Sequence, residues 1–350
     1  MKGGSSGVKD LARNALAVDD SWSFTVAAAT DTTAPTVASV IPTDGATGVA
    51  ASANASAVFS EGMDSTSISG STFGLVKEGT IVSLAASIAY DATSKTATLD
   101  PNLDLEAGAR YTATVKGGAG GVKDAAGNAL AQDKVWSFII APPLARDFFA
   151  RTVSGGWGTA EVGGAWSILN GAASNFAVNG SQATLNTPKG GAQQAAHLGS
   201  LSARDLDARV QLTVLTALNG SRNLVTYLLL RNQSSGTHYR IGLVLTPRDE
   251  LFIRGETGVG TRLFADVDTA LRFTPGNTFV LRVQVQGGSP TTIRARVWRS
   301  GAPEPSPWAI VHSDATAALQ TAGSVGIRMI NESNTAVRVE LDDFLVARLP

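Results

Sequence analysis

The sequence contains no cysteine, which excludes disulfide frameworks, thiolate zinc sites and a cysteine nucleophile. Charged residues are also scarce: they make up 16% of the chain, where about 25% is typical of globular domains. Because 28 Lys and Arg stand against 29 Asp and Glu, the formal net charge is -1, and no overall field attracts nucleic acid. No apolar run approaches the roughly 18 to 20 residues of a membrane helix. We therefore expect neither nucleic-acid binding nor membrane insertion.

Length and composition indicate a turn-rich globular protein. The chain has 350 residues, of which 43% are hydrophobic, with 37 glycines and 13 prolines. At roughly 100 to 200 residues per domain, this length predicts two domains or three. Short stretches of alternating apolar and polar residues lie between turn signals, and convincing helical periodicity is lacking. The sequence therefore predicts an all-β fold.

An internal repeat marks the N-terminal region. Residues 2–24 and 116–138 are 114 positions apart and agree at 16 of 23 positions. The second copy follows an alternating run at 109–115 that is typical of a strand, so it closes a domain that begins far upstream. We therefore expect residues 1–26 to be the C-terminal hairpin of a preceding repeat, 27–33 to be a linker, and the chain to be a fragment of a longer tandem array. This would also explain why residues 1–6 lack the apolar core of a signal peptide. The alternative is an independent N-terminal arm that adds to a sheet edge.

Residues 34–140 have the strand spacing of an immunoglobulin-like (Ig-like) sandwich. Pro, Gly, Asp and Asn separate short alternating stretches at intervals of about 8 to 15 residues. The predicted strands are 36–41, 53–59, 72–76, 85–90, 96–99, 110–116 and 134–140. Glu61 and Asp64 are assigned to turns or caps, because no partner base or further ligand cluster accompanies them. Asp124, with Gly127 and Asn128, suits a tight turn.

Six short motifs occur in order along this region. They are APTV at 34–37, PTDGATGV at 42–49, FSEGMD at 59–64, YTATV at 111–115, KDAAGN at 123–128 and WSF at 136–138. Together they resemble the bacterial Ig-like domain of the S-layer-protein type. Such domains usually serve as repeated spacers in secreted or surface-attached proteins. The resemblance therefore implies an extracellular or cell-surface location, neighbouring modules in the same protein and a structural role.

After a linker at 141–145, residues 146–350 are predicted to form one larger β domain. The predicted strands are 208–215, 223–231, 239–245, 251–255, 262–265, 279–286, 291–299, 325–330 and 337–346. That number in a domain of this size suits a two-sheet jelly roll. The motifs DFFAR at 147–151, GGWG at 155–158, GGAW at 163–166 and VELDDF at 339–344 resemble the concanavalin A-like, or laminin-G-like, sandwich modules of bacterial exported proteins.

The hairpin at 279–299 offers the best binding face in the larger domain. Apolar residues at alternate positions from Phe279 to Val297 are expected to point inward, which leaves the residues between them pointing outward. The outward set is Arg282, Gln284, Gln286, Arg294, Arg296 and Trp298. A sugar ring stacks on an indole while its hydroxyls bind planar polar groups, so we predict a polysaccharide or cell-surface glycan as partner. The alternative is a solvated face whose Arg stems cover the aromatic ring.

Three carboxylates suggest a structural calcium site. The first and last strands of a jelly roll commonly pair, which would bring Asp147 close to Asp342 and Asp343. Carboxylate oxygens are the hard ligands that calcium prefers. The alternative is that these acids end their strands in water. We expect that the protein requires no cofactor and that a structural calcium is the only ion it would bind.

The sequence predicts no catalysis. Glycoside hydrolases of this fold need two carboxylates about 5 to 10 Å apart across one cleft. The nearest acidic run places Glu340 and Asp342 on one strand face but lacks the third acid of the E-x-D-x-x-E pattern. His197, His238 and His312 lie far apart in sequence, in no zinc-ligand spacing, and are assigned to surface or packing positions.

The expected protein is thus a non-catalytic fragment of a secreted or cell-surface multi-module protein. Its Ig-like spacer would carry a sandwich that binds carbohydrate. One alternative is that both domains are passive spacers or parts of an adhesin. A further alternative is an accessory part of a glycoside hydrolase.

Overall fold

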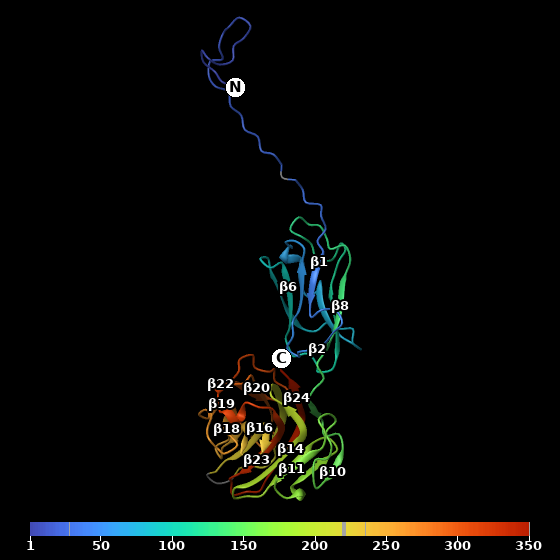
Figure 1. The fold of residues 1–350 in the computed structure, drawn as a ribbon, viewed down its shortest axis with the longest axis vertical. Helices are drawn as coiled ribbons and strands as arrows, with labels where there is room; N and C mark the ends of the chain where they lie inside the picture. The colour runs from blue at the N-terminus through green and yellow to red at the C-terminus, as the bar shows by residue number, and fades with distance from the viewer. Residues whose placement is uncertain (28, 219–221, 235, 350) are drawn as a thin grey trace.

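The structure is a computed structural model that describes residues 1–27, 29–218, 222–234 and 236–349. An extended N-terminal segment, a smaller β sandwich and a larger β sandwich follow one another along the long axis of the molecule (Figure 1). The helical elements in the described residues are short 3-10 turns: η1 (Ser65–Ser67), η2 (Ala173–Asn175) and η3 (Ala317–Leu319). In the part of the chain described, no helix is long and apolar enough to span a membrane. The predicted all-β fold with two sandwiches is confirmed.

The smaller sandwich packs two four-stranded sheets against each other. One sheet has the order β1 (Val37–Ile41), β3 (Ala55–Phe59), β6 (Thr96–Pro101) and β5 (Ala86–Asp91). The other has the order β2 (Ala46–Val49), β8 (Lys134–Ile140), β7 (Arg110–Val115) and β4 (Phe73–Lys77). All the strands predicted here are present. The sequence does not predict β2, because four residues that include a glycine show no clear alternation.

Alternation along the strands builds the core of the smaller sandwich. Every second side chain of β7 and β8 is buried, namely Tyr111, Ala113, Val115, Trp136, Phe138 and Ile140. Trp136 packs on Phe73, with ring centroids 5.9 Å apart, and Tyr111 stacks on Phe138 at 6.3 Å. The repeated motif WSF therefore supplies two of the largest core side chains.

The larger sandwich has a nine-stranded and a seven-stranded sheet around one apolar core. The nine-stranded sheet has the order β10 (Thr152–Ser154), β12 (Phe176–Asn179), β13 (Ala183–Thr187), β24 (Val337–Arg348), β15 (Leu206–Val214), β20 (Thr278–Gln286), β21 (Thr291–Arg299) and β22 (Ile310–Asp314), and β9 (Ala145–Asp147) also pairs with β24. The seven-stranded sheet has the order β11 (Trp166–Asn170), β14 (Ala192–Ala203), β23 (Gly323–Asn331), β16 (Leu224–Ser234), β17 (Thr237–Leu245), β18 (Glu250–Thr257) and β19 (Val267–Arg272). The pairing of β9 with β24 is the predicted pairing of first and last strands.

Most predicted strands of the larger sandwich are present, but the one at 262–265 is wrong. Those residues form a loop in which Arg262 makes an isolated bridge to Glu256, and β19 follows the loop. The sequence also misses β19 and β22, and it misses β9 to β14. Several of these strands are short, and the Gly- and Ala-rich stretch that holds them gives weak alternation.

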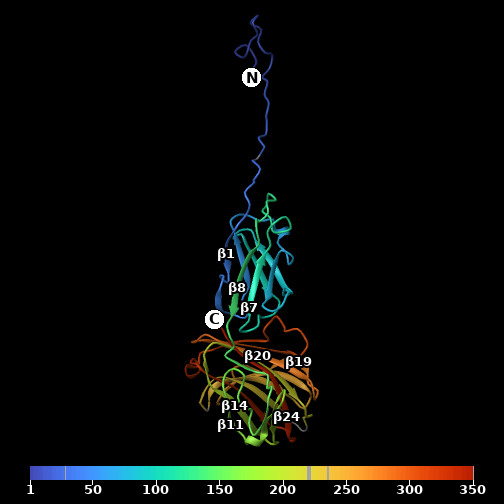
Figure 2. The same cartoon turned by 90° about the vertical axis from the view of Figure 1, so that its right-hand side faces the viewer.

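The smaller sandwich stands over the outer face of the nine-stranded sheet, and the end of β24 lies at this junction (Figures 1 and 2). Asp104, in the loop between β6 and β7, accepts a hydrogen bond from Arg282 of β20. In the linker, Leu144 N donates to Val346 O of β24 at 2.7 Å. The junction therefore places one loop of the smaller sandwich directly on the predicted binding hairpin.

The N-terminal segment folds one compact loop that copies its repeat. Gly4 N donates to Leu16 O at 2.8 Å, as Gly118 N donates to Leu130 O at 2.7 Å. The isolated bridges Lys9↔Ala15 and Lys123↔Ala129 also correspond. Beyond the loop the copies differ, because residues 20–26 form no strand where residues 134–140 form β8.

Candidate functional site

The predicted glycan-binding hairpin β20–β21 has the expected side-chain directions but no open aromatic surface. Its alternate apolar residues from Phe279 to Val297 are buried in the core, as predicted. Trp298, however, is only 8% exposed. The prediction of Trp298 as a stacking surface is therefore wrong, because the outward direction of a strand residue does not by itself ensure that the residue is exposed.

The loop after β21 covers part of this face. Arg296 Nη1 donates to the carbonyl of Pro305 at 2.6 Å, and its guanidinium lies 4.1 Å from the ring centroid of Trp308. Arg296 also forms an ion pair with Glu304. Burial, despite the charge of Glu304, lowers the pKa of Arg296. Arg296 thus holds a loop in place.

Arg282 is the centre of an ion-pair cluster at the domain junction. Its Nε lies 3.0 Å from both oxygens of Asp207, its Nη1 donates to Glu304 at 2.7 Å, and its Nη2 reaches Asp104 of the smaller sandwich. Although burial opposes the charged form, the hydrogen bonds and charge of Asp207 raise the pKa of Arg282. Arg282 is therefore committed to holding the two sandwiches together.

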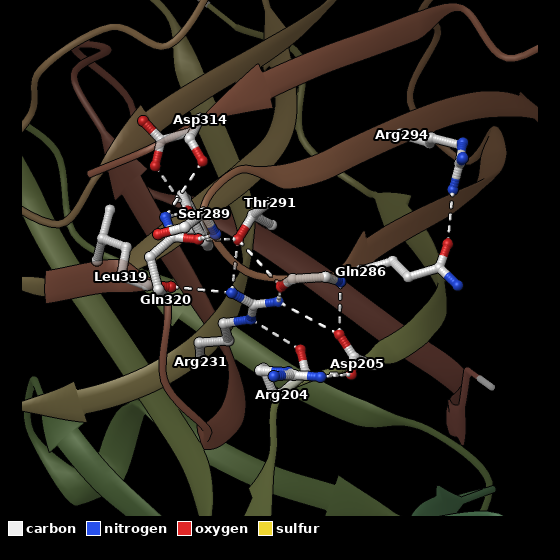
Figure 3. A network of polar contacts seen from close by, with 12 residues as sticks. Arg204, Asp205, Arg231, Gln286, Ser289, Thr291, Arg294, Asp314, Leu319 and Gln320 are labelled. Atoms are coloured by element: carbon white, nitrogen blue, oxygen red, sulfur yellow. Dashed lines mark hydrogen bonds and ion pairs between the residues drawn. The ribbon is translucent and has the colours of Figure 1, made fainter. Parts of the chain in front are cut away.

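The remaining residues predicted on this hairpin are half-buried and bonded within the protein. Gln284 Nε2 donates to Asp207 at 2.8 Å. Arg294 Nη1 donates to Gln286 at 3.2 Å, as Figure 3 shows. The six predicted residues thus lie on one hairpin, but many of their polar groups are already hydrogen-bonded to other groups of the protein.

The predicted calcium site loses its central ligand. Asp147 lies near Asp342, as predicted, but it is fully buried and accepts four hydrogen bonds. Arg151 donates two of them at 2.7 Å, Phe149 N donates one at 2.8 Å and Trp166 Nε1 donates one at 2.7 Å. Two carboxylate oxygens have about four lone-pair sites, so Asp147 has none left for a cation.

Asp342 and Asp343 are the two remaining carboxylates of that prediction. Burial and the charges of Asp343 and Asp147 raise the pKa of Asp342. Asp343 accepts a hydrogen bond from Gln211. A calcium site on Asp342 and Asp343 alone stays a prediction.

A different group of carboxylates lies in the smaller sandwich. Among the described residues, Asp31, Glu61 and Asp124 have carboxylate oxygens within 4.8 Å of one another. Asp124 already accepts hydrogen bonds from Ala126 N, Asn128 N and Asn128 Nδ2. These bonds confirm its predicted role in a turn. Asp64 likewise caps η1, with Thr66 N donating to it at 2.9 Å.

The three histidines occupy separate places, as predicted. His238 is 3% exposed, and the ring of His312 lies 5.6 Å from that of Phe264. His197 Nδ1 lies 2.8 Å from Ser324 Oγ and 3.2 Å from Asn232 Nδ2, and burial lowers its pKa. His197 is therefore a neutral ring near neutral pH, on the outer face of the seven-stranded sheet.

That outer face gathers polar side chains from strands far apart in the sequence. Residues opposite each other in the register share a face. One row across β14, β23, β16, β17 and β18 is His197, Gly326, Leu229, Arg240 and Glu256; the next is Ala195, Arg328, Tyr227, Gly242 and Arg254; the third is Gln193, Ile330, Val225, Val244 and Phe252. We call these three rows the polar face. A Cβ at Gly326 would clash with Ala196 O and would lie 2.8 Å from the Cβ of His197, so glycine permits the close approach of β14 to β23.

Glu256 organises one side of the polar face. Tyr227 Oη donates to it at 3.0 Å, Arg240 Nε donates to it at 2.9 Å, and Arg262 Nε lies 3.0 Å from its other oxygen. Burial and the neighbouring charge of Glu256 raise the pKa of Tyr227. The phenol therefore stays protonated and serves as a hydrogen-bond donor.

Arg254 and Asp266 form a two-bonded ion pair beside this group. Arg254 Nε and Nη2 lie 3.0 and 2.6 Å from the two oxygens of Asp266. Burial opposes the charge of Arg254, but the hydrogen bond and charge of Asp266 raise its pKa. The carboxylate of Asp266 is correspondingly held ionised, with its pKa below the ordinary value despite burial.

Arg328 lies at the centre of the polar face. Its Nη2 donates to Gln193, but its Nε is buried and has no hydrogen-bond partner within the described residues. Burial and the charge of Arg240 lower the pKa of Arg328. A buried donor without a partner needs an explanation, and a water or ligand oxygen would supply the missing acceptor.

A separate network fixes the end of the sandwich beside the polar face. Arg231, at a bulge of β16 with φ of 52°, turns its fully buried guanidinium inward. It donates to Arg204 O, Thr291 Oγ1, Leu319 O and Gly287 O at 2.7 to 3.0 Å (Figure 3). The next residue, Asn232, lies against His197 and Ser324. The bulge therefore positions Asn232 at the polar face while Arg231 ties three loops together.

Sequence reasoning missed the polar face for a physical reason. The predicted strands at 239–245 and 251–255 already carry Arg240 and Arg254 at positions between inward aliphatic residues. His197 and Arg328, which lie on the same face, come from β14 and β23, one earlier and one later in the chain. Without the sheet order, nothing in the sequence brings these residues together.

Comparison with known families gives a match to part of the chain. Residues 31–139 match the model of a family described as Bacterial Ig-like domain. The predicted resemblance of the smaller sandwich to a bacterial Ig-like domain is thus confirmed, while its S-layer type stays a prediction. No curated protein matches the chain.

Several solved structures are also similar. A structure of the alginate lyase Aly36B with alginate trisaccharide is 11% identical, with 60% of this chain and 99% of that chain covered and a TM-score of 0.44. A protein of unknown function with a galectin-like fold from Bacillus subtilis is 10% identical, with 52% and 89% covered and a TM-score of 0.37. The VIP36 exoplasmic/lumenal domain, bound to Ca²⁺ and Man3GlcNAc, is 12% identical, with 53% and 84% covered and a TM-score of 0.35. The chain therefore combines a region similar to a bacterial Ig-like domain with a second, larger β sandwich.

Proposed function

We propose that this chain is a non-catalytic part of a secreted or cell-surface multi-module protein, in which an Ig-like spacer carries a glycan-binding sandwich. The glycan site is the polar face of the seven-stranded sheet. It replaces the β20–β21 hairpin as the binding surface, because the smaller sandwich and the 300–309 loop engage that hairpin.

The observation that carries the proposal concerns Arg328, which donates from Nη2 to Gln193. The Nε of Arg328 has no hydrogen-bond partner among the described residues. Planar side chains with several donors and acceptors suit sugar hydroxyls, which both donate and accept. Partly exposed Phe252, in the third row, supplies a ring on which the C–H face of a sugar can stack. Arg254 and His197 flank these groups.

The carboxylates at the polar face support a binding role over hydrolysis. Glu256 is held by Tyr227, Arg240 and Arg262, and Asp266 is held by Arg254. A general acid needs a proton near neutral pH. Despite burial, the hydrogen bond and charge of Arg254 lower the pKa of Asp266, so Asp266 does not suit the proton-donor role of a glycoside hydrolase. The carboxylate of Glu256 is already hydrogen-bonded to Tyr227 and Arg240.

A glycan array probed with the full chain, with and without calcium, tests the proposal. We expect a saturable ligand whose affinity falls roughly tenfold or more in Arg328→Gln, because a hydrogen bond from a charged group contributes about 1.5 to 3 kcal/mol. Phe252→Ala should weaken the same ligand. Arg294→Gln is the matched control, since Arg294 is a half-buried arginine on the outer face of the other sheet.

A hit that survives Arg328→Gln and Phe252→Ala but is lost in Arg294→Gln would return the site to the β20–β21 hairpin. No hit at all would favour the alternative in which both sandwiches are passive spacers or adhesin parts. Calcium dependence would point to Asp342 and Asp343.

We also infer that residues 1–26 are the last loop and strand of another Ig-like repeat. The support is the shared hydrogen-bond pattern of residues 2–16 and 116–130. In the second copy this loop leads into β8, which pairs with both β7 and β2. The first copy would need the same two partners from a preceding sandwich body.

A fusion tests this inference. Residues 31–114 are placed directly before Met1, so that residues 1–26 continue them in the register of 115–140. We expect a second folded sandwich in which Trp22 becomes buried, seen as a blue shift of its fluorescence. A control fusion carries residues 116–138 in place of 2–24 and must fold by design. If the control folds while Trp22 stays exposed in the test fusion, residues 1–26 are an independent arm.

A further inference from the structure

A cavity of about 520 Å³ lies at the junction of the two sandwiches. One wall comes from the loops of the smaller sandwich around 84–85 and 101–107. The other is the outer face of β9, β15 and β24 in the nine-stranded sheet. Ligand sites are typically concave, lie preferentially at domain interfaces and have volumes of roughly 300 to 1,000 Å³. This cavity is separate from the polar face, which belongs to the other sheet.

The walls of the cavity are mainly apolar. Leu103 projects from the smaller sandwich and is 68% exposed, and Phe148, directly after β9, is 46% exposed. Leu345 of β24 and Pro143 of the linker also belong to the apolar lining. Large apolar side chains exposed on facing walls of one cavity indicate a site for an apolar group.

Two arginines stand on the floor of this cavity, on either side of Leu345. Arg146 of β9 is opposite Leu345, and Leu345 is opposite Arg209 of β15, so the three side chains share one row and one face. With strands about 4.8 Å apart, the two arginine backbones are separated by roughly 10 Å. A single anionic group above Leu345 can therefore reach both guanidinium groups.

These arginines have unused hydrogen-bonding capacity. Arg209 is half-buried, and it has neither an ion pair nor a hydrogen-bonded side-chain partner within residues that the structure describes. Arg146 forms an ion pair with Glu161, whose oxygen lies 3.6 Å from the buried Arg146 Nε, but this Nε makes no hydrogen bond in the described part of the chain. The Arg146 guanidinium also lies 5.4 Å from the ring centroid of Phe148, so Arg209 is the unpaired cation of the two. An unpaired cation in a half-buried site loses part of its hydration without compensation, so an anion bound there would be stabilised.

The other two cations of the cavity lining are paired with carboxylates. Lys77 is paired with Glu106, and Arg282 is paired with Asp104 and Asp207. Asp343 accepts from Gln211. Arg209 is thus the arginine of the lining whose charge is left for a ligand.

We propose that the cavity between the sandwiches binds a small amphipathic anion, with its carboxylate or sulfonate on Arg209 and Arg146 and its aromatic or aliphatic body against Phe148 and Leu103. The ligand contacts both sandwiches, and it therefore also favours the arrangement in which they are docked. The site is independent of the glycan-binding proposal, because it uses the opposite sheet.

The test uses the full chain and the fluorescent probe 8-anilinonaphthalene-1-sulfonate, an aromatic anion. We expect saturable binding at one main site, at least about tenfold tighter than binding of the uncharged analogue N-phenyl-1-naphthylamine. Arg209→Gln should weaken the anion by a similar factor and leave the uncharged analogue unchanged. Leu103→Asn should weaken both probes, and because Leu103 is largely exposed, this change leaves the fold intact.

The controls separate this site from others. Arg328→Gln and Arg294→Gln lie outside the cavity and should leave the anion affinity unchanged. If the anionic probe also binds to the exposed residues 22–26, Arg209→Gln should leave the affinity of that second site unchanged. Equal anion affinity in the wild-type protein and Arg209→Gln, with equal melting temperatures, overturns the proposal, as does equal affinity for the charged and uncharged probes.

Discussion

Residues 2–24 and 116–138 have nearly the same sequence, yet the same side chains are exposed in one copy and buried in the other. Trp22 is 69% exposed, whereas its counterpart Trp136 is 1% exposed. Phe24 is 81% exposed, and Phe138 is completely buried. The loops before them nevertheless keep the same hydrogen bonds. The chain thus contains one structural motif with a core and one without.

This difference separates what local interactions determine from what requires a sandwich. The loop closes through contacts within about fifteen residues, so it forms in both copies. The strand that follows needs neighbours: residues 134–140 pair with β7 and β2, whereas residues 20–26 form no strand. A strand makes its backbone hydrogen bonds to neighbouring strands and not within its own segment, so a similar sequence without those neighbours does not form the strand.

Replacing the tryptophan in each copy gives the largest expected contrast. Trp136→Ala should destabilise the smaller sandwich by about 3 to 5 kcal/mol, because it removes a buried indole that packs on Phe73. Trp22→Ala should leave the unfolding free energy unchanged. Denaturant unfolding followed by fluorescence measures both. A loss of more than about 1 kcal/mol in Trp22→Ala would mean that the N-terminal segment packs on a sandwich in solution.

The leucine pair extends the same comparison within the loop. Leu130 is 6% exposed and Leu16 is 39% exposed. Leu130→Ala should cost about 2 to 3 kcal/mol, while Leu16→Ala should cost nothing measurable in the unfolding of the sandwich. Equal melting temperatures for the two variants would contradict the idea that burial, rather than the loop itself, gives this leucine its effect.

The same division explains how far the sequence predicts this protein. Alternation within single strands correctly predicts the Ig-like strands and the inward side of β20 and β21, because each is a local pattern. Whether an outward residue is exposed depends on what covers the sheet. Trp298 points outward as predicted, but it is only 8% exposed.

The sequence does not predict a site whose residues come from strands that are far apart in the chain. Asp147 and Asp342 lie near each other as predicted, because first and last strands pair in this kind of sandwich. The sequence could not reveal that Arg151 and Trp166 occupy the oxygens of Asp147. The polar face likewise depends on the order of five strands.

Asp10 and Asp124, the corresponding turn aspartates of the two copies, should both have low pKa values but should differ in their effect on the free energy of unfolding. Despite burial, hydrogen bonds from Asn128 hold the pKa of Asp124 below its ordinary value of 3.8, and bonds from Asn14 do the same for Asp10. A depressed pKa means stability that is fully present above about pH 4 and lost as the pH falls through the folded value. We expect NMR to show low pKa values for both carboxyls.

Only the titration of Asp124, which lies in the copy that is part of the smaller sandwich, should change the free energy of unfolding of that sandwich. In Asp124→Asn, the acid-dependent loss of stability below about pH 4 should shrink relative to the wild-type protein, with an effect smaller than that of Leu130→Ala. Asp10→Asn should leave the pH dependence of unfolding unchanged. A normal pKa for Asp10 would show that its loop does not persist without a sandwich around it.

The glycine pair should give the smallest effect and the most direct test of the loop itself. Gly118 and Gly4 have φ values of 69° and 77°, and a Cβ at either position would meet no atom within 4 Å. Alanine would therefore add only the strain of a left-handed backbone, about 1 kcal/mol. In the second copy this strain should appear as lower stability of the sandwich. In the first copy it has no sandwich to destabilise, so Gly4→Ala should instead open the loop, with faster hydrogen exchange at the Val8 N–H that donates to Lys2 O. Unchanged exchange at Val8 would mean that the loop closes without needing a left-handed residue at position 4, and that its match to the second copy comes from the hydrogen bonds of Asp10 and Asn14 alone.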